Sequence, residues 1–183
     1  MSVEDTDAAR ERDRRRTAAE VRDDLVRTAF VTEESVYGVV LVSGMIVVAG
    51  THGSTAWEVF WIVAVTVVVF WAAHVYAGTV ARHGLAIDHV MPLRQAFDAA
   101  LQHSLGLLAS AMLPSLILLL GALRVVPDAL TIWLALWAGV LVLAVLGFVA
   151  YRRRGAPWPM QLLGALTTAA FGLVMIVLKA FIH

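Results

Sequence analysis

The feature that most constrains this chain is a long apolar run without charge. Residues 57–82 read WEVFWIVAVTVVVFWAAHVYAGTVAR, and no charged side chain lies between Glu58 and Arg82. As an α-helix this segment would be about 39 Å long, which is enough to cross the hydrocarbon core of a bilayer with some tilt. A run of this length predicts a membrane-spanning helix rather than a buried strand.

The composition agrees with a chain whose solvent is largely lipid. Apolar residues make up 60% of the chain and charged residues 15%, whereas soluble domains average about 45–50% and 25%. The formal net charge is zero, so no overall field favours nucleic acid as a partner. The absence of cysteine excludes disulfides and thiolate metal sites.

Five apolar segments predict an all-α, polytopic membrane protein with five transmembrane helices. The expected spans are residues 34–50, 57–82, 101–123, 129–151 and 158–181. They form a membrane domain over residues 33–183, preceded by a charged, partly helical tail over residues 1–32. Within the fifth span, Gly164, Thr168 and Gly172 recur every four residues, a spacing typical of closely packed membrane helices.

The distribution of basic residues predicts the orientation of the bundle. If the N-terminus is inside, twelve of the fourteen basic residues lie in inner segments and only Arg124 and Lys179 lie in outer ones. Basic residues are enriched on the cytoplasmic side of membrane proteins. We therefore expect a protein of the inner cell membrane with a cytoplasmic N-terminus and an external C-terminus.

This orientation places several polar side chains in the cytoplasmic half of the membrane. They form a candidate site that comprises Glu34, Tyr37, His74, Tyr76 and His103. Ionisable residues at membrane depth are rare and often functional. A carboxylate beside imidazoles can relay protons or bind a divalent cation, and Glu34 and His74 are the candidate metal ligands.

An ordinary structural explanation exists for four of these five residues. Glu34 would stabilise the start of a helix through the macrodipole. Tyr37 and Tyr76 would lie at the level of the lipid headgroups, and His74 would form a hydrogen bond between helices. The loop after the second span offers a separate set of possible metal ligands, namely His83, Asp88 and His89.

Two classes of function are compatible with these features. The first is a small transporter or channel for protons or cations, assembled as a homo-oligomer because five spans enclose little space. The second is a membrane scaffold or accessory subunit that docks a partner protein. No nucleophile, zinc-protease or phosphate-loop motif is present, so we do not expect an enzyme. Whether the protein binds a cofactor is unknown from the sequence.

Two segments resemble the vacuolar iron transporter (CCC1-type) family of five-span membrane proteins. ESVYGVVLVSGMIVVAG (34–50) is similar to that family's first span, and ASAMLPSLILLLGAL (109–123) resembles its third. The resemblance implies the five-span plan. The family's first-span Asp-Gly and second-span Ser-Met are absent, as are the acidic metal-binding helices between spans two and three. The resemblance therefore transfers no metal ligand to this chain.

The predicted topology can be tested with reporter fusions. Reporters fused after Ala56 and after His183 should both be external, because each follows an odd number of spans. A reporter fused at Ala86 should be internal. Alkaline phosphatase activity, which requires export, distinguishes the two sides, and an internal C-terminus would contradict the five-span topology.

Overall fold

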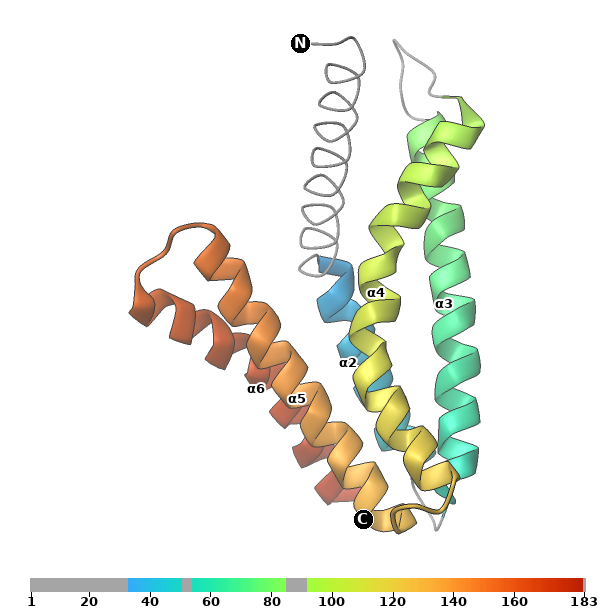
Figure 1. Cartoon of the computed structure of the whole chain (residues 1–183), viewed down its shortest axis with the longest axis vertical. Coiled ribbons are helices and arrows are strands. Elements are labelled where there is room, and N and C mark those ends of the chain that lie inside the picture. The colour runs from blue at the N-terminus through green and yellow to red at the C-terminus, as the bar shows by residue number, and fades with distance from the viewer. Residues whose placement is uncertain (1–32, 51–53, 85–91, 183) are drawn as a thin grey trace, which may run out of the picture.

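The computed structural model describes residues 33–50, 54–84 and 92–182, and these residues are almost entirely helical (Figure 1). The helices are α2 (Glu33–Ala49), α3 (Ala56–Gly84), α4 (Leu93–Ala122), α5 (Asp128–Arg153) and α6 (Trp158–Ile182). They occupy the five predicted segments, and α4 begins ahead of the expected start at residue 101. The predicted tail over residues 1–32 lies outside the described residues.

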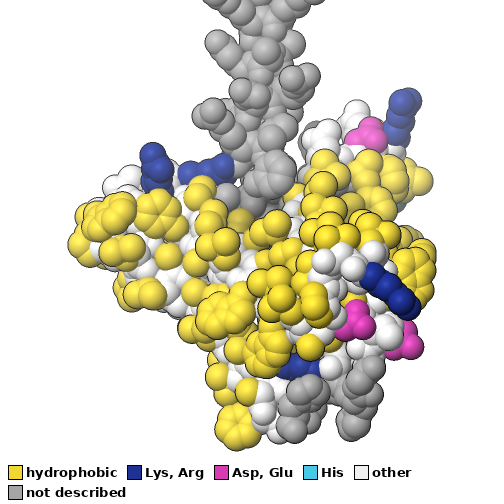
Figure 2. Space-filling model, turned by 60° about the horizontal axis from the view of Figure 1, so that its bottom comes forward, with side chains coloured by type: hydrophobic (Ala, Val, Ile, Leu, Met, Phe, Trp, Pro, Cys, Tyr) yellow, Lys and Arg dark blue, Asp and Glu magenta, His cyan; other side chains and the backbone are white. Residues whose placement is uncertain are grey.

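Four of these helices, α3 to α6, are long and apolar enough to cross a membrane. This finding fits a multi-pass membrane protein. Helix α2 has 17 residues, which corresponds to about 25 Å and is near the lower limit for a span. Hydrophobic side chains cover much of the face seen in Figure 2, and α3 and α6 bury the smallest share of their residues. Most of their surface is therefore available to lipid.

The helices form two antiparallel hairpins with α2 between them (Figure 1). One hairpin is α3 with α4, and the other is α5 with α6. Helix α2 contacts all four of the other helices. The hairpins meet at the lower end of Figure 1, where residues 123–127 join α4 to α5, and they separate toward the upper end. The N-terminal end of α2 therefore lies toward the side on which the hairpins diverge.

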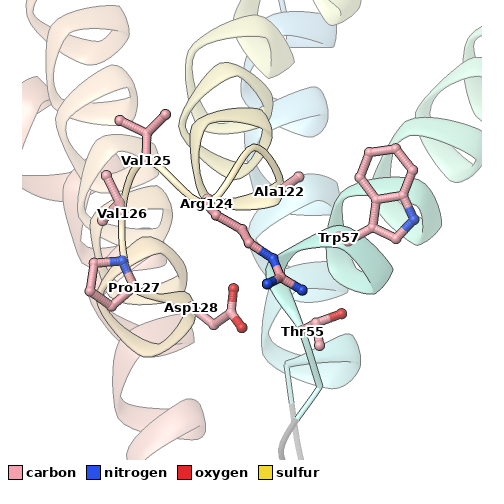
Figure 3. Close-up of a pocket in the computed structure, with 9 residues that line it drawn as sticks. Thr55, Trp57, Ala122, Arg124, Val125, Val126, Pro127 and Asp128 are labelled. Carbon is pink, nitrogen blue, oxygen red and sulfur yellow. The ribbon is translucent and has the colours of Figure 1, made fainter.

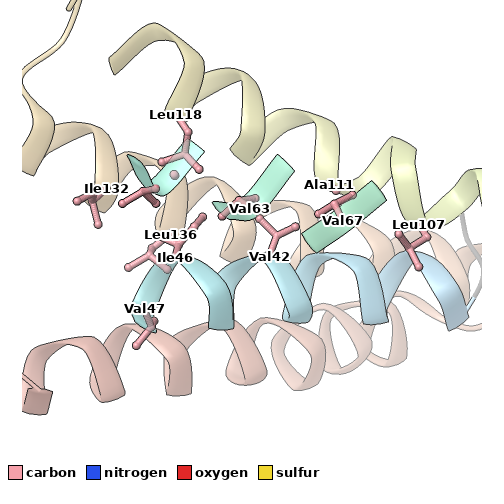
Figure 4. Packing of buried hydrophobic residues seen from close by; sticks show 12 residues of the cluster. Val42, Ile46, Val47, Val63, Val67, Leu107, Ala111, Leu118, Ile132 and Leu136 are labelled. Atoms are coloured by element: carbon pink, nitrogen blue, oxygen red, sulfur yellow. The ribbon is translucent and has the colours of Figure 1, made fainter. Parts of the chain in front are cut away.

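The largest hydrophobic cluster surrounds α2 (Figure 4). Its members are mainly β-branched residues and leucines that are almost completely buried. They come from α2 (Val42, Ile46, Val47), α3 (Val59, Val63, Val67), α4 (Leu107, Ala111, Leu118) and α5 (Ile132, Ala135, Leu136). Their interlocking fixes the position of α2 between the hairpins.

Small residues allow α5 and α6 to approach closely. A Cβ atom added at Gly147 of α5 would lie 2.3 Å from the backbone oxygen of Gly164 in α6. One added at Gly172 would lie 2.9 Å from Val140. The Thr168 hydroxyl donates a hydrogen bond of 2.7 Å to the carbonyl oxygen of Leu143 across the same interface. The predicted small-residue stripe of the fifth span is thus confirmed as a helix-packing surface.

A buried lysine holds the C-terminal end of α2. Lys179 of α6 is only 2% exposed, and its Nζ donates a hydrogen bond to the carbonyl oxygen of Gly50, which follows α2. A cation at this end of a helix complements the macrodipole and pairs with a carbonyl that has no partner within the helix. The sequence analysis placed Lys179 on the outer side of the membrane, and nothing in the sequence predicted its hydrogen bond to Gly50.

The close approach of α5 and α6 predicts different effects for two equivalent substitutions. Gly147→Ala should destabilise the protein by about 1–3 kcal/mol, because the new methyl group collides with the backbone of α6. Gly44→Ala should be neutral or stabilising, since an added Cβ at Gly44 has no atom within 4 Å and alanine favours helix. Thermal unfolding in a mild detergent measures both. Equal stability of the two variants would contradict the interface.

Candidate functional site

Glu34 is the most deeply buried member of the candidate site. It is the second residue of α2, and its side chain is only 3% exposed. Acidic residues near the N-terminal end of a helix are stabilised by the macrodipole. The burial has another cause, because α2 is surrounded by the other helices and the carboxylate therefore points into protein rather than water.

Two histidines approach the same oxygen of this carboxylate. The Nε2 atom of His103, on α4, lies 2.5 Å from Oε1 of Glu34. The Nε2 atom of His74, on α3, lies 3.8 Å from that oxygen. The first distance corresponds to a close ion pair when the imidazole is protonated. The second is a contact between groups that attract each other when the imidazole is protonated.

The other carboxylate oxygen of Glu34 has a different environment. Oε2 is buried and has no hydrogen-bond partner among the described residues. A buried polar atom without a partner costs free energy, so this oxygen is a favourable point for binding a proton or a cation. Glu33, Glu34 and His103 could supply one ligand atom each, and these three atoms lie within 4.8 Å of one another. Oxygen and imidazole ligands suit divalent metals such as Mn²⁺, Fe²⁺ or Zn²⁺.

The structure places the two predicted tyrosines elsewhere. Tyr37 is 61% exposed and Tyr76 is 72% exposed, so neither side chain is buried with the carboxylate of Glu34. Helical phase explains the difference for Tyr76, because it follows His74 by two residues and residues at this spacing do not share a helix face. Exposed tyrosines on an apolar surface are typical of the membrane–water interface.

The sequence analysis did not include Glu33 in the site. Its carboxylate is exposed but close enough to join Glu34 and His103 around one ion. Of the separate loop ligands, His83 is exposed near the end of α3, and Asp88 and His89 lie outside the described residues. Two adjacent acidic residues are common in helices and do not by themselves indicate a metal site. The proximity of His103 from α4 is what makes Glu33 and Glu34 candidate ligands.

The site is accessible through its histidines. The side chain of His103 is 45% exposed and that of His74 is 36% exposed, whereas the carboxylate between them is buried. His74 also lies against the ring of Phe70, with 6.3 Å between the ring centres. A proton or small cation could therefore reach Glu34 by way of an imidazole, without an open channel to the carboxylate.

Comparison of the chain with protein-family models, with curated proteins and with solved structures finds no match. The function of the site is therefore inferred from its own residues. The similarity of two segments to the vacuolar iron transporter family stays a prediction.

The two distances predict different coupling energies. A double-mutant cycle of Glu34→Gln with His103→Gln should give an interaction energy of about 1–3 kcal/mol, as for hydrogen bonds to charged groups. The matched cycle of Glu34→Gln with His74→Gln should give a smaller value, because that contact is longer. Unfolding of the purified protein in mixed detergent measures both cycles. Equal energies would show that the 2.5 Å contact has no special strength.

Proposed function

We propose that this protein is a small integral membrane transporter in which Glu34, His74 and His103 bind a proton or a small cation. The observation that carries the proposal is the buried carboxylate of Glu34, which has one oxygen shared by two histidines and the other without a hydrogen-bond partner. These three residues come from three different helices. A change in their protonation or ligation would therefore act on the packing of α2, α3 and α4 together.

The chemistry of the three groups supports this function. Imidazole is the side chain whose charge normally changes between pH 5 and 8, and a carboxylate within hydrogen-bonding distance can exchange a proton with it. The same donor set binds divalent metals. A proton and a metal ion would compete for it, because ligation requires a neutral imidazole and an ionised carboxylate. Competition of this kind is how an exchanger couples two ions.

The proposed setting is the inner cell membrane, with the N-terminus in the cytoplasm and α2 as a fifth span. The site would then lie near the cytoplasmic surface, since Glu34 is at the N-terminal end of α2. His74 lies ten residues before the end of α3, so this helix would extend about 15 Å beyond the level of the site. The exposed apolar surface of α6 supports contact with lipid or with a second copy of the chain.

The alternative is a membrane scaffold or accessory subunit that transports nothing. The broad exposed surfaces of α3 and α6 support this function equally well, because a partner helix could pack there. In that case the contact between Glu34 and His103 would serve only to hold α2 against α4. The two functions differ in whether titration of the site moves an ion across the membrane.

A flux assay in reconstituted vesicles tests the proposal. Wild-type protein should move protons or a divalent ion such as Mn²⁺, and Glu34→Gln and His74→Ala should each lower the rate at least tenfold. His74→Gln should fold as wild type, because an amide can still form hydrogen bonds, but should not transport, because it cannot titrate. Internal pH-sensitive and metal-sensitive dyes report the two fluxes.

The matched control is Tyr76→Phe, which changes an exposed side chain on the same helix as His74. This variant should retain the wild-type rate. Full flux in His74→Gln, or no flux of protons or divalent ions by the wild-type protein, would overturn the transport function and favour the scaffold.

A further inference from the structure

A second site lies at the end of the bundle away from Glu34. It is a cleft of about 920 Å³ beside the turn that joins α4 to α5 and the start of α3 (Figure 3). The side chains that give it chemical character are Thr55, Trp57, Arg124 and Asp128. Because α4 and α5 are both long and apolar enough to cross a membrane, the turn between them lies at a membrane surface.

Arg124 occupies a backbone conformation that normally selects glycine. Its φ angle is 60°, and hydrogen bonds from Arg124 N to Gly121 O and from Val125 N to Leu120 O close the end of α4 in a Schellman motif. The left-handed position of this motif usually holds glycine, because a side chain there is strained. Helix α5 ends in the same pattern with Gly155, whose φ is 67°. An arginine at the α4 position is therefore retained at a conformational cost.

The side chain of Arg124 extends into the cleft (Figure 3). In Figure 3 its guanidinium points toward the side chains of Asp128 and Thr55. Among residues 33–50, 54–84 and 92–182 it forms no ion pair, and the side chain is exposed. A planar guanidinium with free donors binds phosphate through two parallel hydrogen bonds. The strained backbone conformation of Arg124 thus places a side chain that can bind phosphate in an open cleft.

The opposite charge and an aromatic ring line the same cleft. Asp128 accepts a hydrogen bond of 3.2 Å from the backbone N–H of Ala56 through Oδ1, which anchors an otherwise exposed carboxylate. Trp57 is half exposed and packs edge-on against Trp61, with 5.6 Å between the ring centres. Exposed tryptophans of this kind lie at the level of lipid headgroups. A carboxylate and an indole face are both groups that attract an ammonium ion.

We propose that this cleft binds the headgroup of a zwitterionic phospholipid, with the lipid phosphate on Arg124 and its ammonium group beside Asp128. A purely anionic headgroup fits less well, because it would be repelled by Asp128 and by the carboxylate of Glu58, which accepts a hydrogen bond from the backbone N–H of Thr55. A lipid fits better than a free phosphate, because the cleft opens at the membrane surface where headgroups are concentrated. This inference is independent of the proposed ion transport.

Lipid retention in native mass spectrometry tests this site. The full chain is purified in dodecyl maltoside containing equal amounts of phosphatidylethanolamine and phosphatidylglycerol. Wild-type protein should retain one phosphatidylethanolamine at least fivefold more often than phosphatidylglycerol, and inorganic phosphate at 10 mM should not displace it. Arg124→Gln should lower this retention at least fivefold, as should Arg124→Gly.

The glycine variant separates binding from folding. Arg124→Gly relieves the backbone strain, so without added lipid its unfolding temperature should rise by about 2–4 °C although it loses the lipid. Arg94→Gln, which removes an exposed arginine near the other end of α4, is the matched control and should retain the lipid. Retention by both Arg124 variants within twofold of wild type would overturn the site. Equal retention of phosphatidylglycerol, or displacement by phosphate, would overturn the zwitterionic lipid as its ligand.

Discussion

The packing of α2 against all four other helices is the interaction on which the rest of the structure depends. The hairpins contact each other directly only through α4 with α5 and, at few positions, α3 with α5, whereas α6 does not contact α3 or α4. Between membrane helices in lipid, van der Waals contact and hydrogen bonds replace the hydrophobic effect as the source of association. The small and β-branched residues of α2 supply much of that contact, so this short helix and the direct packing of α4 on α5 together determine how the hairpins are arranged.

The two ends of α2 carry buried charged groups of opposite sign. Glu34 lies at the N-terminal end, and Lys179 donates to Gly50 at the C-terminal end. Both signs match the helix macrodipole, so each charge is stabilised by the helix that it touches. The ends nevertheless differ in their surroundings. Lys179 is held by a backbone carbonyl, whereas Glu34 is contacted by two histidine side chains from other helices.

Hydrophobic length predicted the helices, because a run of twenty apolar residues has few other structures available in lipid. The four-residue spacing of Gly164, Thr168 and Gly172 likewise predicted the small-residue stripe of the fifth span. The site was predicted only in part. Glu34, His74 and His103 share a depth along their helices, which residue counting can estimate, but the helix face of each depends on packing. The absence of amphipathic patterning in helices surrounded by lipid explains why Tyr37 and Tyr76 could not be separated from the site. The roles of Lys179 and Arg124 depend on contacts with distant segments, which no local pattern encodes.

The burial of Glu34 is the basis of the proposed ion-binding function. A buried carboxylate is costly, because an ionised group loses hydration on burial and one neighbouring charge compensates for that loss only in part. Here one oxygen is contacted by both imidazoles while the other has no hydrogen bond among the described residues. A structural pair would be expected to satisfy both oxygens. Under the proposed function, the carboxylate that binds and releases an ion should instead keep one oxygen without a protein partner, so that the ion can occupy that position.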